Sequence, residues 1–181
     1  MNDLTETRLA SEQLLDGKLL KVYRDEVRLP DGETSMREWI DHPGAAAVVP
    51  FLADGSVLMV RQYRYAAQQA FLEVPAGKVD GSDESLEAVA RRELEEETGW
   101  QADRLTPIGA AHAAIGYSNE VIHFFLAEGL RHGTHAPEED EFLEVVTLDF
   151  GEVVARARQG EVTDMKTLAA LFFAENHLAA R

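Results

Sequence analysis

Residues 92–100 read RELEEETGW, in which four glutamates lie within five positions and a glycine follows. Apolar residues recur at helical spacing from Leu86 to Leu94, so this run predicts the second half of an amphipathic helix. Ser82 and Asp83 are residue types that cap the N-terminus of a helix, and Gly99 is typical of the position after its end. We therefore expect a helix that starts after Ser82 or Asp83 and stops at Gly99.

The glutamates of this helix point in more than one direction. At about 100° per residue, Glu93, Glu96 and Glu97 fall within an arc of about 100° on the side that carries the apolar residues. A charged surface helix with salt bridges is one interpretation. Carboxylates that cluster on an apolar side, however, repel one another and lose solvation unless a cation neutralises them. Because oxygen ligands suit Mg²⁺ and Mn²⁺, the spacing also predicts a site for such an ion.

The whole chain predicts two domains of unequal size. Residues 1–42 contain the turn dipeptides Asp16-Gly17 and Asp31-Gly32 and read as a small antiparallel meander that buries too little to stand alone. Residues 43–181 predict an α/β fold with helices on the faces of a mixed sheet. The expected order is several strands, a helix, more strands and two closing helices. The expected strands are 45–52, 57–65, 71–74 (with a break at 75–77), 105–115, 121–126 and 143–148, and the closing helices are 150–159 and 163–177.

Composition excludes several classes of protein. The 181 residues include 33 acidic and 17 basic ones, which gives a formal net charge of −16. So acidic a surface disfavours nucleic-acid binding, and an anionic substrate would need a recruited cation. The chain has no cysteine, which excludes disulfides and a thiol nucleophile. With neither a signal-peptide core nor an apolar run of membrane-spanning length, we expect a cytoplasmic protein that binds no membrane.

The region from Gly77 to Trp100 resembles the Nudix box, G-x5-E-x7-R-E-U-x-E-E-x-G-U, where U is a bulky apolar residue. Gly77, Glu84 and the run that starts at Arg92 occupy the fixed positions. One spacing differs, because six residues rather than five separate Gly77 from Glu84, and Asp83 stands in the five-residue register. The resemblance implies a Nudix α/β/α sandwich. It also implies a pyrophosphohydrolase that cleaves a nucleoside diphosphate linked to another group, X.

The resemblance also implies roles for individual residues. The implied metal ligands are Glu93, Glu96, Glu97, the backbone carbonyl of Ala76, and Glu141. The implied supporting residues are Gly77, Glu84 and Arg92, of which Arg92 orients the glutamates. About two or three Mg²⁺ or Mn²⁺ ions would bridge the diphosphate and lower the pKa of the attacking water. A carboxylate would accept the proton of that water. The candidate catalytic residues are Glu139, Glu141 and Glu96.

A second acidic cluster, PEEDEF, occupies residues 137–142. Runs of like charge are usually solvated loops, but the resemblance places here a loop that brings the base over the metals. Glu139 and Glu141 align best with the base and a ligand. Which residue has which role stays open, since a shift by one residue would bring in Glu138 or Asp140.

Segments outside the box are similar to the ADP-ribose pyrophosphatase branch of the family. They are residues 37–45, 61–65, 73–77 and 117–120. In that branch the N-terminal strands exchange across a dimer, which implies a homodimer whose active sites draw on both subunits. The implied substrate-binding residues are Arg37, Arg64, Glu73 and Glu120. For the two arginines, an ion pair with a neighbouring acid is the alternative. Glu73 could instead hold the loop of the metal site or be a paired carboxylate of an edge strand, and Glu120 could be a structural carboxylate.

The expected reaction converts ADP-ribose to AMP and ribose 5-phosphate. Ile115 stands where the branch commonly carries a proline. Sugar nucleotides, dinucleotides and dinucleoside polyphosphates therefore stay open as substrates. A nucleotide-binding module without catalysis is a further alternative, against which the complete set of box glutamates argues.

Overall fold

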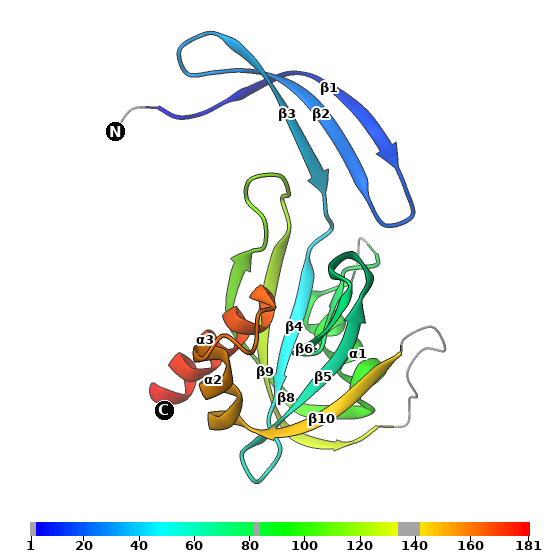
Figure 1. Cartoon of the computed structure of the whole chain (residues 1–181), viewed down its shortest axis with the longest axis vertical. Helices are drawn as coiled ribbons and strands as arrows, with labels where there is room; N and C mark the ends of the chain where they lie inside the picture. The colour runs from blue at the N-terminus through cyan, green and yellow to red at the C-terminus, as the bar shows by residue number, and fades with distance from the viewer. Residues whose placement is uncertain (1–2, 82–83, 134–141) are drawn as a thin grey trace. The chain divides into compact units, whose positions relative to one another are not determined.

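A computed structural model describes residues 3–81, 84–133 and 142–181. The chain forms two compact units (Figure 1). The first contains the residues up to Pro43 together with His112–Glu120, and the second contains Gly44–Ala111 and Val121–Arg181. No helix in the described part of the chain is long and apolar enough to span a membrane.

The first unit is an antiparallel three-stranded meander. Its strands are β1 (Thr7–Asp16), β2 (Lys21–Arg28) and β3 (Thr34–Asp41). Backbone hydrogen bonds within residues 17–20 and 29–32 close the two turns, each at 2.9 Å. Gly32 has a φ of 91°, a conformation that costs glycine little and other residues more. The two predicted turns are therefore confirmed.

Residues 112–120 extend the first unit. The amide of Ile40, in β3, donates to the carbonyl of Tyr117 at 2.8 Å. The side chain of Asn119 donates to the carboxylate of Asp41 at 2.8 Å. The end of β3 is thus hydrogen-bonded to residues 112–120, the segment that follows along the chain between the two stretches of the second unit.

The second unit contains two sheets. Its strands are β4 (Ala45–Pro50), β5 (Ser56–Arg64), β6 (Gln69–Glu73), β7 (Ala76–Lys78), β8 (Trp100–His112), β9 (Val121–His132) and β10 (Leu143–Asp149). One sheet has the order β7-β4-β9-β8 and the other the order β10-β5-β6. Because β4 runs parallel to β9 and antiparallel to β7, the four-stranded sheet is mixed. All six residues of β4 are buried, so this strand lies at the centre of the fold.

Helices cover both faces of the mixed sheet (Figure 1). They are α1 (Leu86–Thr98), α2 (Phe150–Arg158) and α3 (Met165–Ala179). Ala46 and Val48, on one face of β4, share a buried cluster with Leu94 of α1. On the other face, Phe124 of β9 contacts Phe173 of α3, with ring centroids 5.4 Å apart. The predicted α/β/α sandwich with an N-terminal antiparallel sheet is therefore confirmed.

Helix α1 starts later than the sequence predicts. Its N-cap is Ser85, whose hydroxyl accepts a hydrogen bond from the amide of Ala88 at 3.2 Å. Ser82 and Asp83, the predicted caps, lie outside the described residues. Ser85 directly precedes the first apolar residue of the helix, where a hydroxyl reaches the unpaired amides of the first turn. Gly99 ends the helix as predicted, with a φ of 73°.

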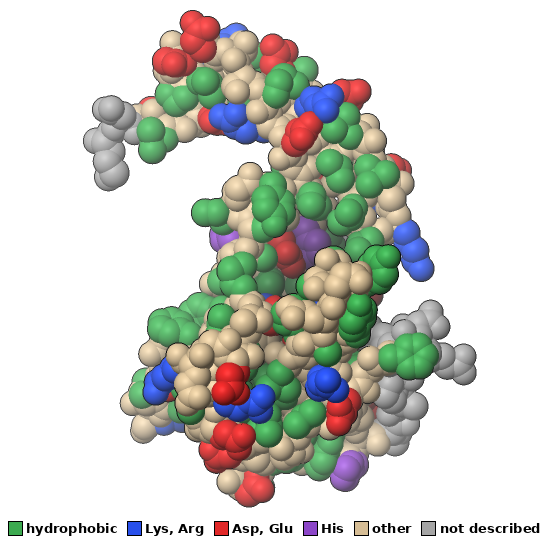
Figure 2. All heavy atoms as spheres, viewed as in Figure 1, with side chains coloured by type: hydrophobic (Ala, Val, Ile, Leu, Met, Phe, Trp, Pro, Cys, Tyr) green, Lys and Arg blue, Asp and Glu red, His purple; other side chains and the backbone are tan. Residues whose placement is uncertain are grey.

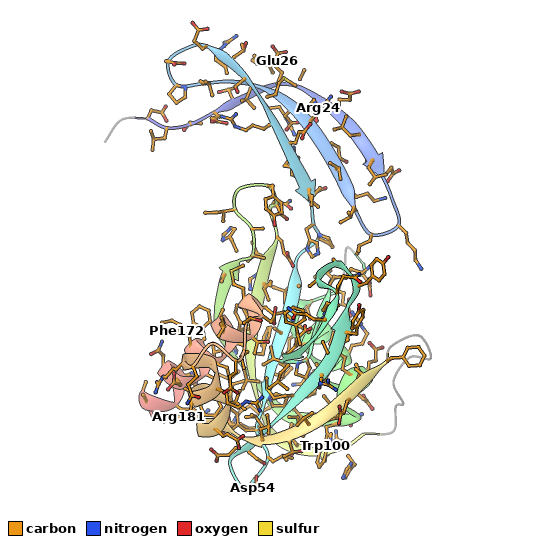
Figure 3. All side chains as sticks on the ribbon, viewed as in Figure 1. Arg24, Glu26, Asp54, Trp100, Phe172 and Arg181 are labelled. Atoms are coloured by element: carbon orange, nitrogen blue, oxygen red, sulfur yellow. The ribbon has the colours of Figure 1, made fainter. Side chains whose placement is uncertain are left out.

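Strand β8 starts well before the predicted residue 105. It follows the helix at once with Trp100 (Figure 3), whose ring packs on that of His132 with centroids 3.9 Å apart. Polar residues interrupt the apolar pattern here, and one of them, Arg104, pairs with Glu128 of β9 at 2.6 Å. Cross-strand partners of this kind stabilise the first five residues of β8, which the apolar pattern does not reveal.

The chain changes sheets between β6 and β7. Pro75 has no amide hydrogen, and its carbonyl accepts a hydrogen bond from Val48 of β4 at 2.9 Å. Residues 76–78 then pair with β4. The sequence predicts only a break at residues 75–77, and this prediction is incomplete because the partner of β7 lies some thirty residues away.

Candidate active site

Helix α1 directs two of its glutamates into the protein. Glu93 and Glu97 have only 9% and 4% of their surface exposed. Glu96 is partly exposed, and Glu87 on another side of the helix is exposed. The inward direction that helical spacing predicts for Glu93 and Glu97 is thus confirmed.

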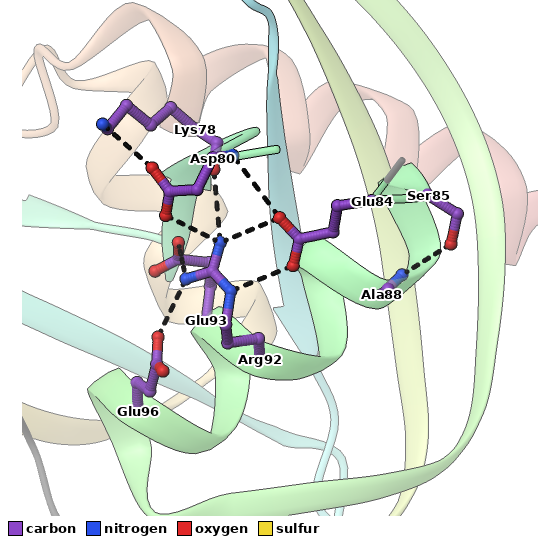
Figure 4. A network of polar contacts seen from close by, with 8 residues as sticks. All are labelled: Lys78, Asp80, Glu84, Ser85, Ala88, Arg92, Glu93 and Glu96. Carbon is purple, nitrogen blue, oxygen red and sulfur yellow. Dashed lines mark hydrogen bonds and ion pairs between the residues drawn. The ribbon is translucent and has the colours of Figure 1, made fainter. Parts of the chain in front are cut away.

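Arg92 is the centre of a polar network (Figure 4). Its Nη1 donates to Oε1 of Glu93 at 2.7 Å and to Oε2 of Glu96 at 2.9 Å, and its Nε donates to Oε1 of Glu84 at 3.1 Å. The hydrogen bond from Arg92 holds the pKa of Glu84 below its usual value. Burial acts to lower the pKa of Arg92, but the surrounding carboxylates outweigh burial and raise this pKa above its usual value. The guanidinium therefore stays charged. One arginine thus donates hydrogen bonds to three carboxylates.

Strand β7 lies directly against the buried glutamates. The amide of Ala76 donates to Oε2 of Glu97 at 3.0 Å. A Cβ atom at Gly77 would lie 1.8 Å from Oε1 of Glu93, far inside van der Waals contact. The backbone of β7 thus holds the carboxylate of Glu97 by a hydrogen bond. It leaves room for the carboxylate of Glu93 only because residue 77 is glycine.

The network carries more negative than positive charge. Its four carboxylates and two cations are those of Asp80, Glu84, Glu93 and Glu96, and of Lys78 and Arg92. Glu97 adds a fifth carboxylate beside β7. Excess negative charge that is partly removed from water favours a further cation. Carboxylate oxygens are hard donors, and their chemistry fits Mg²⁺ or Mn²⁺.

The glutamates of α1 do not form a complete ligand set by themselves. Among residues 3–81, 84–133 and 142–181, no three acidic or histidine side chains are placed to hold one ion together. In this arrangement Nη1 of Arg92 contacts both Glu93 and Glu96. An ion held by these carboxylates would therefore need further oxygen ligands.

Another buried carboxylate lies at the end of β6. Glu73 is 1% exposed, and its two oxygens accept hydrogen bonds from Nε (2.8 Å) and Nη2 (2.6 Å) of Arg64. Nζ of Lys166, in α3, also donates to Glu73. Burial acts to raise the pKa of Glu73, but the hydrogen bonds and charges of the two cations bring it below its usual value. The pKa of Arg64 is raised, chiefly by the hydrogen bond to Glu73 and in smaller part by the charge of Glu97.

Arg37 and Glu120 belong to the first unit. Nε and Nη2 of Arg37 donate to the carboxylate of Glu6 at 2.9 and 2.5 Å. Oε1 of Glu120 lies 3.8 Å from Nε2 of His42. Both predicted arginines, Arg37 and Arg64, are therefore paired with an acid on one edge of the guanidinium.

A sequence profile of the NUDIX domain matches residues 41–171, well over half of the chain. The chain belongs to the Nudix family. A second profile, the nucleoside diphosphate sugar hydrolase N-terminal domain, matches residues 6–40.

Relatives of this Nudix protein align over nearly its whole length. It is 39% identical to the ADP-ribose pyrophosphatase of Bacillus subtilis (strain 168), over 94% of this chain and 93% of that protein. It is 34% identical to the methanol dehydrogenase activator of Bacillus methanolicus, over 92% and 90% of the two chains. The crystal structure of an ADP compounds hydrolase shares the fold, with a TM-score of 0.87, 22% identity and coverage of 99% and 98%. The chain is thus a Nudix hydrolase of the ADP-ribose pyrophosphatase type.

The extra residue in the Nudix box does not separate Glu84 from the network. Glu84 precedes the N-cap of α1, accepts the hydrogen bond from Arg92, and accepts another from the amide of Asp80 at 3.4 Å. Ile115 is 84% exposed, in the segment that belongs to the first unit. The predicted loop residues Glu139 and Glu141, with the alternatives Glu138 and Asp140, lie outside the described residues.

The sequence prediction missed the residues at the start of α3. Asp164 caps this helix, and its carboxylate also contacts Lys166 at 2.9 Å. Thr167 is fully buried, and its hydroxyl accepts a hydrogen bond from the amide of Val74 at 3.0 Å. One signal was present in the sequence: a lysine in the first turn of a helix opposes the helix dipole, so another partner must compensate it.

Replacing Gly77 with alanine should displace the Glu93 carboxylate, because the new Cβ and Oε1 cannot occupy the same space. Mutation of residues that only orient the ligands of a metal site typically lowers metal affinity by about 10- to 100-fold, and displacement of a ligand should cost at least as much. We expect Mn²⁺ to bind Gly77→Ala at least about tenfold more weakly than the wild type, as measured by electron paramagnetic resonance of free Mn²⁺. Gly81→Ala is the matched control, since among the described residues no atom beyond its chain neighbours lies within 4 Å of the added Cβ. Unchanged affinity in Gly77→Ala would contradict the assignment of Glu93.

Proposed function

We propose that this Nudix hydrolase cleaves ADP-ribose into AMP and ribose 5-phosphate. The observation that carries the proposal is the proximity of two differently charged groups. The carboxylates of Glu93 and Glu97 suit cations, and Arg64 suits a phosphate. Arg64 donates to Glu73, and three residues further along the chain the amide of Ala76 donates to Glu97. A diphosphate needs both kinds of contact when the protein as a whole is strongly acidic. The similarity to a bacterial ADP-ribose pyrophosphatase supports this choice of substrate.

Divalent metal ions are used by Nudix hydrolases generally, and we assign about two or three Mg²⁺ or Mn²⁺ ions to this site. The proposed ligands are Glu93, Glu96, Glu97, the carbonyl of Ala76, and Glu141. Bound ions would offset the charge of the diphosphate and lower the pKa of the attacking water. Support comes from the oxygen-only donor set and from the excess of carboxylates over cations around Arg92.

The residues of the chain would then divide the work of hydrolysis. Arg92 keeps the α1 glutamates in place, and the outer edge of Arg64 binds the diphosphate. A carboxylate takes the proton of water while the water oxygen bonds to one phosphorus and the bond from that phosphorus to the bridging oxygen breaks. The bridging oxygen leaves on the other phosphate. The candidates for the base are Glu139, Glu141 and Glu96.

We infer that residues 1–42 are a dimerisation domain exchanged between two subunits, and that residues 43–181 are the hydrolase domain. All ten residues of β1 are exposed, and apolar side chains lie on the surface of this unit (Figure 2). Its large exposed apolar residues include Leu9, Leu14, Leu15, Leu20 and Met36. A three-stranded sheet with so much uncovered apolar surface needs a partner. Arg37 and Glu120 would then complete the nucleotide site across the dimer.

The substrate assignment predicts that, with Mg²⁺ present, the protein hydrolyses ADP-ribose with a higher kcat/KM than other nucleoside diphosphate derivatives. Liquid chromatography of the products should show AMP and ribose 5-phosphate in equal amounts. GDP-mannose and NADH are the comparison substrates, because the N-terminal profile is that of sugar-nucleotide hydrolases and a dinucleotide contains the same linkage. A clear preference for either of them would overturn the assignment of ADP-ribose as substrate, but not the proposed hydrolysis of a nucleoside diphosphate derivative.

Glu97→Gln should lower kcat by about 100-fold or more, because a neutral amide stabilises a cation much less than a carboxylate does. Release of phosphate from the products by added phosphatase measures turnover. Glu87→Gln is the matched control, since Glu87 is an exposed glutamate of the same helix. Equal rates of the Glu97→Gln variant and the wild type would mean that the metal assignment is wrong.

Dimerisation predicts a solution mass of twice the 20.1 kDa of the chain, as measured by light scattering after size-exclusion chromatography. A charge at a covered apolar position opposes association, so Leu15→Glu should shift the protein toward a monomer. Leu4→Glu, at an 81% exposed residue outside the strands, should leave the mass unchanged. A monomeric wild type would rule out the exchanged dimer.

A further inference from the structure

Glu73 is held by two cations that come from different parts of the fold. Arg64 reaches it from the end of β5 and uses both carboxylate oxygens. Lys166 reaches Oε2 of the same carboxylate from the first turn of α3. The side chain of Glu73 is 2% exposed and that of Lys166 16%, so water screens this pair only weakly. A buried carboxylate between two cations is fixed in position more firmly than one with a single partner.

The position of Lys166 in the first turn of α3 does not stabilise this helix. A positive charge in the first turn of a helix is opposed by the helix dipole. Here Asp164, the N-cap of α3, contacts Nζ of Lys166 at 2.9 Å and offsets that repulsion. Asp164 thus helps to keep Lys166 in a position where its ammonium group contacts Glu73.

The contact fixes one edge of Arg64 and leaves the other for a ligand. A guanidinium has five N–H donors in a rigid plane, and Glu73 takes one from Nε and one from Nη2. Because the plane is rigid, the orientation of the Glu73 carboxylate sets the direction of the remaining donors. The side chain of Arg64 as a whole is 44% exposed, so a ligand can reach it.

We propose that Lys166 is a positioning residue, which holds the Glu73 carboxylate so that the outer edge of Arg64 faces the diphosphate of the substrate. This role rests on the proposed function, in which Arg64 binds the diphosphate. Lys166 does not touch the substrate and acts through two other side chains. Its removal would let Glu73 rotate and would turn Arg64 away, with little effect on the glutamates of α1.

The kinetic test replaces Lys166 with methionine, which keeps the length of the side chain and removes its charge. We expect KM for ADP-ribose to rise about tenfold with kcat within about threefold, the pattern of a lost binding contact to a charged group. Lys166→Arg, which restores the charge, should return KM to within about threefold of the wild type. Arg158→Met is the matched control, because it breaks the exposed ion pair with Glu175 of α3, at 2.8 Å, and should leave KM unchanged.

A double-mutant cycle shows whether Lys166 acts through Arg64. In an Arg64→Met background, Lys166→Met should change KM by less than about twofold, because the residue to be positioned is gone. An equal effect of Lys166→Met in both backgrounds would overturn the proposal. So would an unchanged KM in the Lys166→Met single variant.

A measurement without substrate separates this inference from the proposed function. In ¹⁵N-labelled protein, the Nε–Hε signal of Arg64 is identified by its loss in Arg64→Met. We expect Lys166→Met to shift this signal and speed its exchange with water, while the backbone spectrum stays folded. An unchanged signal would overturn the positioning role. If the wild type hydrolysed no nucleoside diphosphate derivative, the proposed function would fail, and this signal would still decide whether Lys166 positions Arg64.

Discussion

Two carboxylates buried side by side, those of Glu93 and Glu97, set the constraint on which the second unit depends. Like charges removed from water repel each other and oppose folding unless their surroundings compensate them. The amide of Ala76 does so for Glu97, and the guanidinium of Arg92 does so for Glu93. The network as a whole keeps an excess of negative charge. That excess can attract a divalent cation, and through the cation a polyanion that so acidic a protein would otherwise repel.

The segment from Glu73 to Gly77 carries this constraint across the fold. The amide of Val74 is held by the hydroxyl of Thr167 in α3, and two residues later the amide of Ala76 is held by Glu97 in α1. Between these points the chain leaves one sheet and joins the other. The residue that fixes Arg64 and the residues that accommodate the glutamates thus belong to one short segment. Strands and helices on both sides hold this segment, which gives the site a preorganised frame.

The sequence predicts those parts of the site that depend on near neighbours. Helical spacing is sufficient for the inward direction of Glu93 and Glu97, and Gly99 ends the helix by its own backbone preference. The pairing of β7 and the contact of Lys166 with Glu73 are invisible to such patterns, because their partners are distant along the chain. Polar residues at the start of β8 likewise hid its first five residues, which cross-strand pairs stabilise. The expected chemistry came from the resemblance to the Nudix box, because helical spacing and turn signals alone do not specify a reaction. The roles of individual site residues stay predictions.

The most direct test of metal binding is a crystal structure of the protein with Mn²⁺ and a non-hydrolysable analogue of ADP-ribose. Anomalous scattering locates manganese independently of the protein density. We predict manganese bound to carboxylate oxygens of both Glu93 and Glu97, with the diphosphate of the analogue between the ions and Arg64. Manganese absent from these carboxylates, while the analogue is bound elsewhere, would contradict the account.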